Sequence, residues 1–161
     1  MSGREFRHEQ KYFINTLDYL VAAQRLGRCM DRDPHADIHG NYFIRSLYFD
    51  DTDDTAFRTK LEGTDIRDKY RLRIYNMKDD VIKLERKHKE GQFILKDSLP
   101  LSREECDALL EGDPRFLLRR SHPFARQMYR EFLTRPLRPK VIVDYEREAY
   151  IHPLEDVRVT F

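Results

Sequence analysis

Charged side chains, most of them cationic, gather in four stretches of this sequence that have the alternating pattern of β-strands. The stretches are residues 7–11, 70–73, 83–89 and 145–147. A strand directs successive side chains to opposite faces, so Arg71 and Arg73 would point the same way, and the apolar Leu72 would point the other way. If the charged faces of these strands met, they would line a strongly positive cavity. Such a cavity selects a polyanion, with a phosphate chain as the best match.

Length and composition favour one folded domain that spans residues 1–161, with enough chain for a substantial core. The net charge is only +1, although 37% of the residues are charged, so a general affinity for nucleic acid is not expected. No apolar run reaches the roughly 18 residues of a membrane helix. Cys29 and Cys106 are far apart and lack metal-site spacing, as in reduced cytosolic proteins. We therefore expect a cytoplasmic protein without a membrane segment.

The pattern of apolar, turn and capping residues predicts an α+β fold of antiparallel strands with helices inserted between them. Strands are predicted at residues 6–14, 42–49, 66–75, 81–88, 93–99, 140–150 and 157–161. Helices are predicted at residues 16–30, from residue 52 or 53 to 61, from residue 102, and at residues 114–134 with an interruption near Pro123. Hairpin turns are expected at residues 79–80 and 90–91. Because the sequence ends inside a predicted strand, self-association through an unpaired strand edge is also expected.

Helix ends are marked by residues that bind free backbone N–H groups. Thr16 is the expected cap of the first helix, whose apolar face would carry Leu17, Leu20, Val21 and Leu26. Thr52 or Asp53 is the expected cap of the short helix that ends near residue 61. Ser102 and Glu105 have the spacing of a capping box.

Six motifs occur in a fixed order along the sequence. They are Arg7-x-x-x-Lys11-Tyr12, the segments at residues 45–50, 69–73 and 84–87, Tyr145-x-Arg147-x-Ala149-Tyr150, and the segment at residues 157–161. Together they resemble the VTC (vacuolar transporter chaperone) polyphosphate polymerase domain of the triphosphate tunnel metalloenzyme superfamily, over nearly the whole chain.

The resemblance implies an antiparallel β tunnel lined with Arg and Lys. It implies ATP and inorganic polyphosphate as partners, with transfer of the terminal phosphate of ATP to the chain in the presence of Mg²⁺ or Mn²⁺. By position, the implied catalytic residues are Lys11, Arg71, Arg73 and Lys87. The implied phosphate-binding residues are Arg7, Lys60, Lys96, Arg147 and Arg158. Glu9 and Glu85 are the inward-facing acids expected to hold metal, because Mg²⁺ prefers carboxylate and phosphate oxygens.

Two departures from the family pattern qualify this expectation. The superfamily opens with Glu-x-Glu-x-Lys, and Arg7 occupies the first glutamate position. An added cation suits a polymerase better than a hydrolase, because it binds phosphate where a carboxylate would bind metal. The family's metal-binding glutamate and a last tunnel lysine follow the motif at residues 157–161, where this sequence ends. We therefore expect an incomplete tunnel that binds phosphate chains and polymerises them poorly.

Other interpretations stay open at this point. The domain could hydrolyse tripolyphosphate or nucleoside triphosphates, or it could bind polyanions without catalysis. Charged alternation also occurs on solvated sheet faces, and Glu85 could simply neutralise Lys83 and Lys87. The tunnel interpretation predicts that six side chains converge on one concave surface: Arg7, Lys11, Arg71, Arg73, Lys87 and Arg147.

Two acidic segments imitate metal sites. His35 and His39, with Asp33 and Asp37, lie in a predicted loop, where a solvated loop is the simpler explanation. Residues 50–54 are rich in Asp but lack the glycine and terminal glutamate of a calcium loop, so helix capping explains them better.

Overall fold

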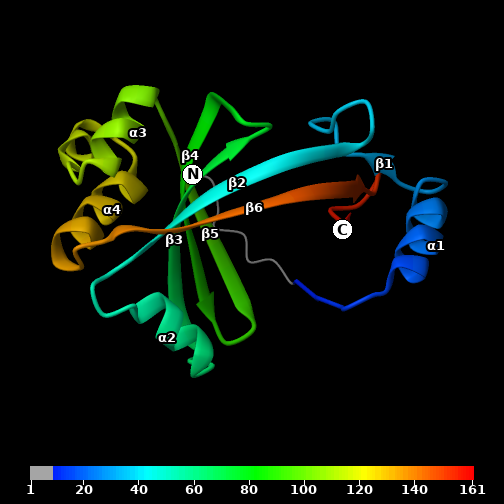
Figure 1. Ribbon diagram of the computed structural model, residues 1–161, viewed down its shortest axis with the longest axis horizontal. Coiled ribbons are helices and arrows are strands. Elements are labelled where there is room, and N and C mark those ends of the chain that lie inside the picture. Colours follow the sequence, from blue (N-terminus) through cyan, green and yellow to red (C-terminus); the bar gives the residue numbers. More distant parts are fainter. Residues whose placement is uncertain (1–8) are drawn as a thin grey trace. The chain divides into compact units, whose positions relative to one another are not determined.

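The computed structural model describes residues 9–161, which form helices and long, curved strands (Figure 1). The strands are β1 (Asp31–Arg32), β2 (Asn41–Asp50), β3 (Ile66–Tyr75), β4 (Lys78–Glu90), β5 (Phe93–Leu101), β6 (Arg138–Ile151) and β7 (Arg158–Thr160). The helices are α1 (Thr16–Leu26), α2 (Thr55–Leu61), α3 (Arg103–Leu110), the 3₁₀ turn η1 (Arg115–Arg119) and α4 (Pro123–Thr134).

Within residues 9–161 the seven strands form one sheet in the order β1-β6-β2-β3-β4-β5, and β7 pairs with β6. The pairs β3–β4, β4–β5, β1–β6 and β6–β7 are antiparallel. The predicted α+β fold of antiparallel strands with inserted helices is therefore confirmed. The described chain divides into two compact units: Arg45–Val143, and Glu9–Ile44 together with Asp144–Phe161.

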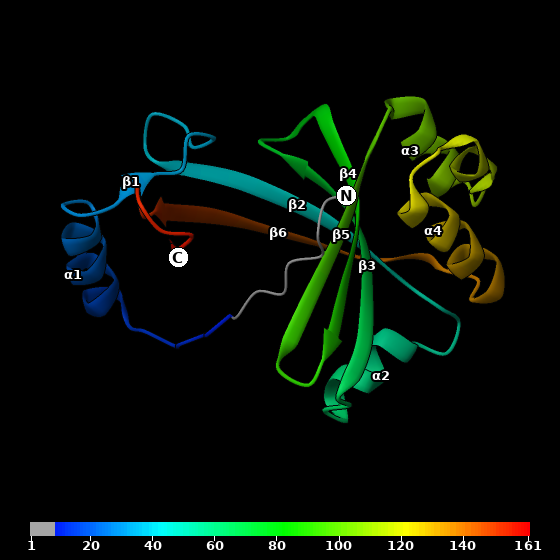
Figure 2. The same cartoon turned by 180° about the vertical axis from the view of Figure 1, so that it is seen from behind.

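In the first unit, β3, β4 and β5 form two consecutive hairpins, which Figure 2 shows from behind. The β4–β5 turn contains Gly91 with a φ of +56°, as predicted. The predicted β3–β4 turn at residues 79–80 is wrong, because Asp79 and Asp80 belong to β4. The turn is made by Asn76 and Met77 with φ angles of +51° and +56°. Asn enters the left-handed region more readily than most residues, so Asn76 was the better signal.

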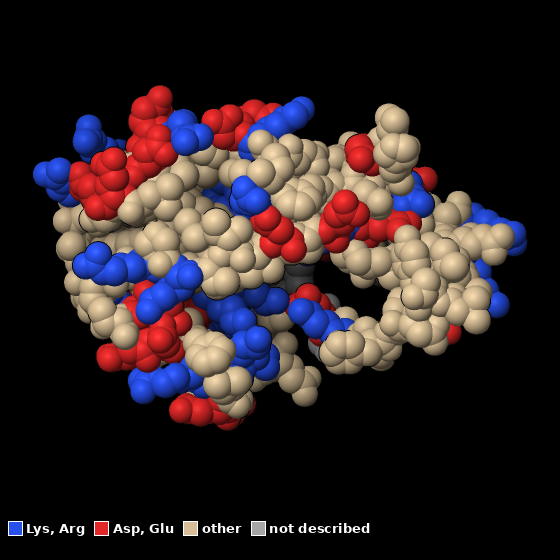
Figure 3. Space-filling model, viewed as in Figure 1, with Lys and Arg blue, Asp and Glu red and all other residues tan. Residues whose placement is uncertain are grey.

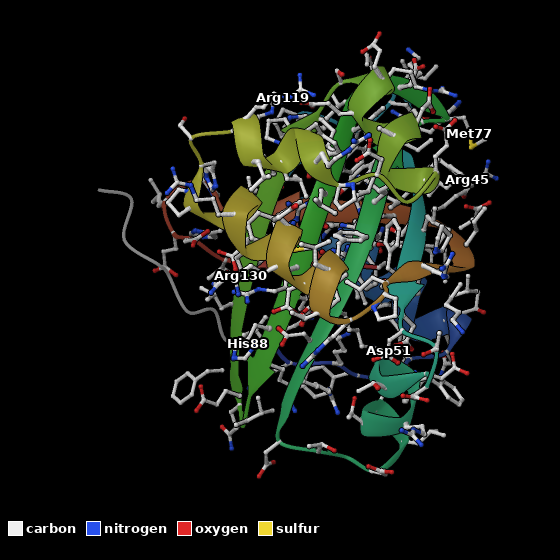
Figure 4. All side chains as sticks on the ribbon, turned by 90° about the vertical axis from the view of Figure 1, so that its left-hand side faces the viewer. Arg45, Asp51, Met77, His88, Arg119 and Arg130 are labelled. Carbon is white, nitrogen blue, oxygen red and sulfur yellow. The ribbon has the colours of Figure 1, made fainter. Side chains whose placement is uncertain are left out.

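One face of these strands forms the hydrophobic core of the first unit. Alternate residues such as Leu72, Leu84 and Leu99 are buried against Leu117 of η1 and Met128 of α4. Figure 4 shows α3, η1 and α4 covering this face of the sheet, with His88 of β4 below α4. Because one face is used for packing, the opposite face of the same strands is available for polar side chains.

Helix α3 begins as predicted. The Glu105 N–H donates to Ser102 Oγ at 3.2 Å, and the Ser102 N–H donates to Glu105 Oε2 at 3.0 Å. Both halves of the capping box are therefore present.

In the second unit, helix α1 differs from its prediction at both ends and in its packing. Asn15 caps it in place of Thr16, because Asn15 Oδ1 accepts the Asp18 N–H at 2.9 Å. The helix ends at Leu26 rather than near residue 30. Its contacts with the strands of its unit run through Tyr19, which hydrogen-bonds Glu148, and Ala23, whose carbonyl accepts the Tyr150 hydroxyl at 3.2 Å.

The prediction that the apolar face of α1 packs against the rest of the protein is therefore wrong. Leu17, Leu20 and Val21 are exposed in the structure, and Leu26 is half-buried. Residues 19 and 23 are four apart and share one side of the helix, whereas residue 17 lies nearly opposite residue 19. Polar anchoring by Tyr19 therefore decides which side faces the strands.

Two strand predictions also need correction. Residues 9–14 were predicted as part of a strand but have no regular secondary structure, and residues 6–8 lie outside the described residues. A strand requires a hydrogen-bonded neighbour, which an alternating pattern cannot supply. Conversely, β1 lies in a predicted loop, where Asp31 and Arg32 pair with Ile151 and Tyr150.

Candidate functional site

The face of β3, β4 and β5 opposite the core is crowded with cations, and we call it the cationic face. Over residues 66–73, 82–90 and 93–101, the continuously paired segments of these strands, it carries eight cations and one carboxylate, Glu85. The cations are Arg67, Lys69, Arg71, Arg73, Lys83, Lys87, Lys89 and Lys96. Figure 3 shows Lys and Arg side chains gathered in a hollow over the lower part of these strands.

The strand register sets the order of charges across the cationic face. Lys69 lies opposite Lys87, which lies opposite Lys96, so three lysines form a row across three strands. Neighbouring strands are about 4.8 Å apart, and like charges opposite one another are destabilising. A bound polyanion would relieve this repulsion, which makes the row a suitable surface for phosphates.

Glu85 occupies the centre of the cationic face and is 1% exposed. Its Oε2 accepts the Arg71 Nε–H at 2.7 Å and lies 2.7 Å from Arg71 Nη2. Oε2 is also 3.7 Å from Arg73 Nη1, and Oε1 is 2.7 Å from Lys96 Nζ. One buried carboxylate is thus shared by three cations. The interpretation that Glu85 neutralises cations fits this geometry. Its three partners here lie on β3 and β5, whereas the cations expected from the sequence, Lys83 and Lys87, lie on its own strand.

Two of the three arginines of the cationic face are also held by β2. Arg71 Nη1 donates to the Tyr48 hydroxyl at 3.1 Å, and Arg73 Nε donates to Ser46 Oγ at 3.1 Å. Sequence reasoning did not select Ser46 and Tyr48 as site residues. Their alternating positions in the motif at residues 45–50 could have indicated them, because residues two apart share a face.

The acid–base properties of Glu85 follow from this setting. Burial alone would raise the pKa of the Glu85 carboxyl, but Arg71, Lys96 and Arg73 together hold that pKa below its usual value.

In the second unit, the pKa of the Glu148 carboxyl is set by a similar balance between burial and its partners. Burial would raise its pKa, and hydrogen bonds from Tyr150 and Tyr19 with the charge of Arg32 lower it. Both carboxylates are therefore ionised partners in the folded protein.

We expect the free energy of unfolding to fall as the pH is lowered through and below about 4.5, the ordinary value for glutamate. A carboxyl with a lowered folded-state pKa stabilises the fold above its unfolded pKa, and this stabilisation is lost as the pH falls through the folded pKa. Urea unfolding at a series of pH values measures the effect. The Glu148→Gln variant should show a weaker pH dependence in this range. A free energy of unfolding that rises on acidification would contradict the assignment.

The metal site that the sequence predicted at Glu9 and Glu85 stays a prediction. Glu85 is occupied by its three cations, and Glu9 lies 3.7 Å from Lys11 Nζ in the other unit. Among residues 9–161 no group of three or more His, Cys, Asp or Glu side chains is placed to hold a metal ion. The pairing of Glu85 with three cations does not favour its role as a ligand of Mg²⁺ or Mn²⁺.

The two acidic segments have local roles. Asp50 and Asp51 accept the N–H groups of Ala56 and Thr55 at the start of α2, at 2.9 and 3.0 Å. Figure 4 shows Asp51 beside this helix. Helix capping explains this segment as expected, but Thr52 and Asp53, the predicted caps, are not the residues that supply it. In the other loop, His35 Nδ1 lies 3.0 Å from Asp33 Oδ1.

The structure brings four of the predicted cationic site residues to the cationic face, beside Glu85: Arg71, Arg73, Lys87 and Lys96. Lys60 is exposed in the last turn of α2, within the same unit. Lys11, Arg147 and Arg158 lie in the other unit, and Arg7 lies outside the described residues. The predicted convergence of all six tunnel residues therefore stays a prediction.

The later arginines have partners within the second unit. Arg147 stacks on Tyr145, with its Cζ 5.3 Å from the ring centroid, and its Nη2 donates to the Tyr145 hydroxyl at 3.1 Å. Arg158 pairs with Asp33 and donates to the Tyr42 hydroxyl. A phosphate at either arginine would have to share it with these groups.

Comparison with known proteins agrees with this architecture. No curated protein matches the chain. A solved Bacillus halodurans protein, described as a "putative adenylate cyclase", superposes with a TM-score of 0.59 at 16% sequence identity. The match covers 91% of this chain and 67% of that one, so the two share a fold.

None of the helices in the described part of the chain is both long and apolar enough to span a membrane.

The family model of the VTC domain matches residues 6–161, almost the whole sequence. Together with the fold, this match supports a triphosphate-tunnel type of domain that binds nucleotides or phosphate. This chain belongs to the VTC domain family.

Proposed function

We propose that this domain binds ATP and inorganic polyphosphate and transfers the terminal phosphate of ATP to the end of the chain. The observation that carries the proposal is the cationic face, with eight cations and one carboxylate in register on β3–β5. Membership of the VTC family supports the same chemistry. A phosphate chain repeats its negative charge at short intervals, as the lysine row repeats its positive charge.

Phosphoryl transfer requires little covalent help from the protein; it requires alignment of the reactants and compensation of charge on the phosphate oxygens. In the proposal, Arg71, Arg73 and Lys87 contact the phosphate that is transferred, and Lys96 extends the contact along the chain. Arginine can hold two phosphate oxygens at once, whereas lysine acts as a point charge. Lys11, Arg7, Lys60, Arg147 and Arg158 are proposed to hold the rest of the nucleotide and chain.

Mg²⁺ or Mn²⁺ is proposed as a cofactor of the reaction. Because the described carboxylates do not form a site for it, no step of the mechanism is assigned to a protein-bound ion. The proposed roles of the protein are confined to binding, alignment and charge compensation by its own side chains.

Incubation of the protein with ATP and either Mg²⁺ or Mn²⁺ tests the proposal. Phosphate chains are separated on a gel, and ADP and free phosphate are measured in parallel. We expect slow chain growth with release of ADP. Release of free phosphate without chain growth would favour a hydrolase. Binding of ATP and polyphosphate with neither product would favour a polyanion-binding module.

A further inference from the structure

We propose that Glu85 is a built-in counter-ion, which stabilises the cationic face without ligand and competes with phosphate for the same cations. The inference rests on the proposed function, because it concerns the same surface. It gives Glu85 a defined effect on affinity: the carboxylate weakens phosphate binding. Glu85 is thus a positioning residue that acts through Arg71, Arg73 and Lys96.

The first step of the argument is that Glu85 uses the donors that a phosphate would use. Arg71 directs both Nε and Nη2 to one oxygen of Glu85, each at 2.7 Å. This edge of a guanidinium is the one that receives an anion with two parallel N–H groups. Lys96 Nζ lies 2.7 Å from the other oxygen. A phosphate that takes these donors must therefore displace Glu85 or share them with it.

The second step is that the cations cannot be left without compensation. The side chains of Arg71 and Arg73 are only 14% and 5% exposed. Buried charges are costly unless they are paired, and removal of one partner of a buried pair leaves the other uncompensated. Without a ligand, the carboxylate supplies that compensation. With a polyanion bound, the ligand can supply it, and Glu85 then adds repulsion.

A matched control is available on the opposite face of the same two strands. Asp97 of β5 pairs with Arg86 of β4, with Oδ2 at 3.1 Å from Nε and 2.6 Å from Nη2. Arg86 and Asp97 are directly opposite in the register, next to the pair formed by Glu85 and Ser98. Like Glu85, Asp97 accepts the Nε and Nη2 groups of an arginine on one carboxylate oxygen. Its side chain, however, points away from the cationic face.

The experiment compares Glu85→Gln, Asp97→Asn and the wild-type protein. Titration calorimetry with inorganic tripolyphosphate gives the affinity, and thermal unfolding with and without tripolyphosphate gives the stability, both at low and high salt. We expect E85Q to melt below the wild type without ligand and to bind tripolyphosphate about tenfold more tightly at low salt, because one repulsive charge and one competitor are gone. Its melting temperature should therefore rise more on ligand addition.

The control variant should separate this effect from a purely structural one. D97N should also melt lower, because it breaks a largely buried ion pair, but its affinity for tripolyphosphate should stay within about twofold of the wild type. If Glu85 only stabilised the fold, E85Q would bind tripolyphosphate as tightly as the wild type or more weakly. Equal or weaker binding by E85Q would overturn the inference while the proposed function stands. A wild-type protein that fails to bind tripolyphosphate would overturn both.

A reciprocal variant keeps the inference testable if E85Q does not fold. Ser98 is exposed and lies directly opposite Glu85, so Ser98→Glu adds a second carboxylate to the cationic face without disturbing the core. We expect S98E to bind tripolyphosphate about tenfold more weakly than the wild type at low salt. Unchanged affinity in S98E would contradict the competition between carboxylate and phosphate.

Discussion

Replacement of both Arg71 and Arg73 by alanine is expected to lower the affinity for tripolyphosphate by about 100-fold or more. Each hydrogen bond to a charged group contributes about 1.5–3 kcal/mol, and about 1.4 kcal/mol corresponds to a factor of ten. Both side chains lie on the cationic face, and each also reaches a hydroxyl of β2. Titration calorimetry at constant ionic strength measures the loss.

The control for this prediction removes two arginines that lie elsewhere. Arg115 and Arg119 are exposed on η1, and their double alanine variant changes the net charge by the same amount. It should bind tripolyphosphate nearly as well as the wild type. The Arg71/Arg73 variant also leaves the buried Glu85 carboxylate with fewer partners, which could disturb the fold. A second double variant, Lys69→Gln with Lys87→Gln, therefore changes two half-buried side chains of the same face. Unchanged affinity in both double variants would exclude the cationic face as the phosphate site.

Replacement of Leu117 by alanine is expected to lower the free energy of unfolding by about 2–5 kcal/mol, the usual cost of a cavity in a packed core. Leu117 is 0% exposed and belongs to the cluster that joins η1 and α4 to the sheet. The loss reflects both the buried apolar surface and the cavity left behind. Urea unfolding followed by circular dichroism measures it.

The neighbouring leucine offers a matched control. Leu118 is in the same 3₁₀ turn but is 54% exposed. Its replacement by alanine should change the free energy of unfolding by about 0.5 kcal/mol or less. Equal losses for the two variants would mean that η1 does not cover the sheet as described.

The fold and half of the candidate site followed from local patterns in the sequence. Alternation at Arg71, Leu72 and Arg73 correctly divided β3 into a cationic and an apolar face, because a strand has a period of two. The capping box at Ser102 and the turn at Gly91 were also correct. Each of these features depends on residues close together in the chain, and the six ordered motifs identified the family.

The partners of Glu85 could not be predicted, because they depend on register between strands. Arg71 is on β3 and Lys96 is on β5. The amino-acid sequence alone does not reveal that both lie beside Glu85. The side of α1 that faces its unit was missed for a similar reason. Tyr19 is not among the residues of the predicted apolar face, yet its bond to Glu148, far away in the chain, decides the packing.

The central claim is that phosphate chains bind on the cationic face of β3–β5, and lysine footprinting of the wild-type protein tests it most directly. An amine-acylating reagent is applied with and without tripolyphosphate, and modification at each lysine is measured by mass spectrometry. Lys140 on β6 serves as an exposed reference. We expect tripolyphosphate to protect Lys69, Lys87 and Lys96 and to leave Lys140 unchanged. Equal protection of all four lysines, or protection of none, would contradict the claim.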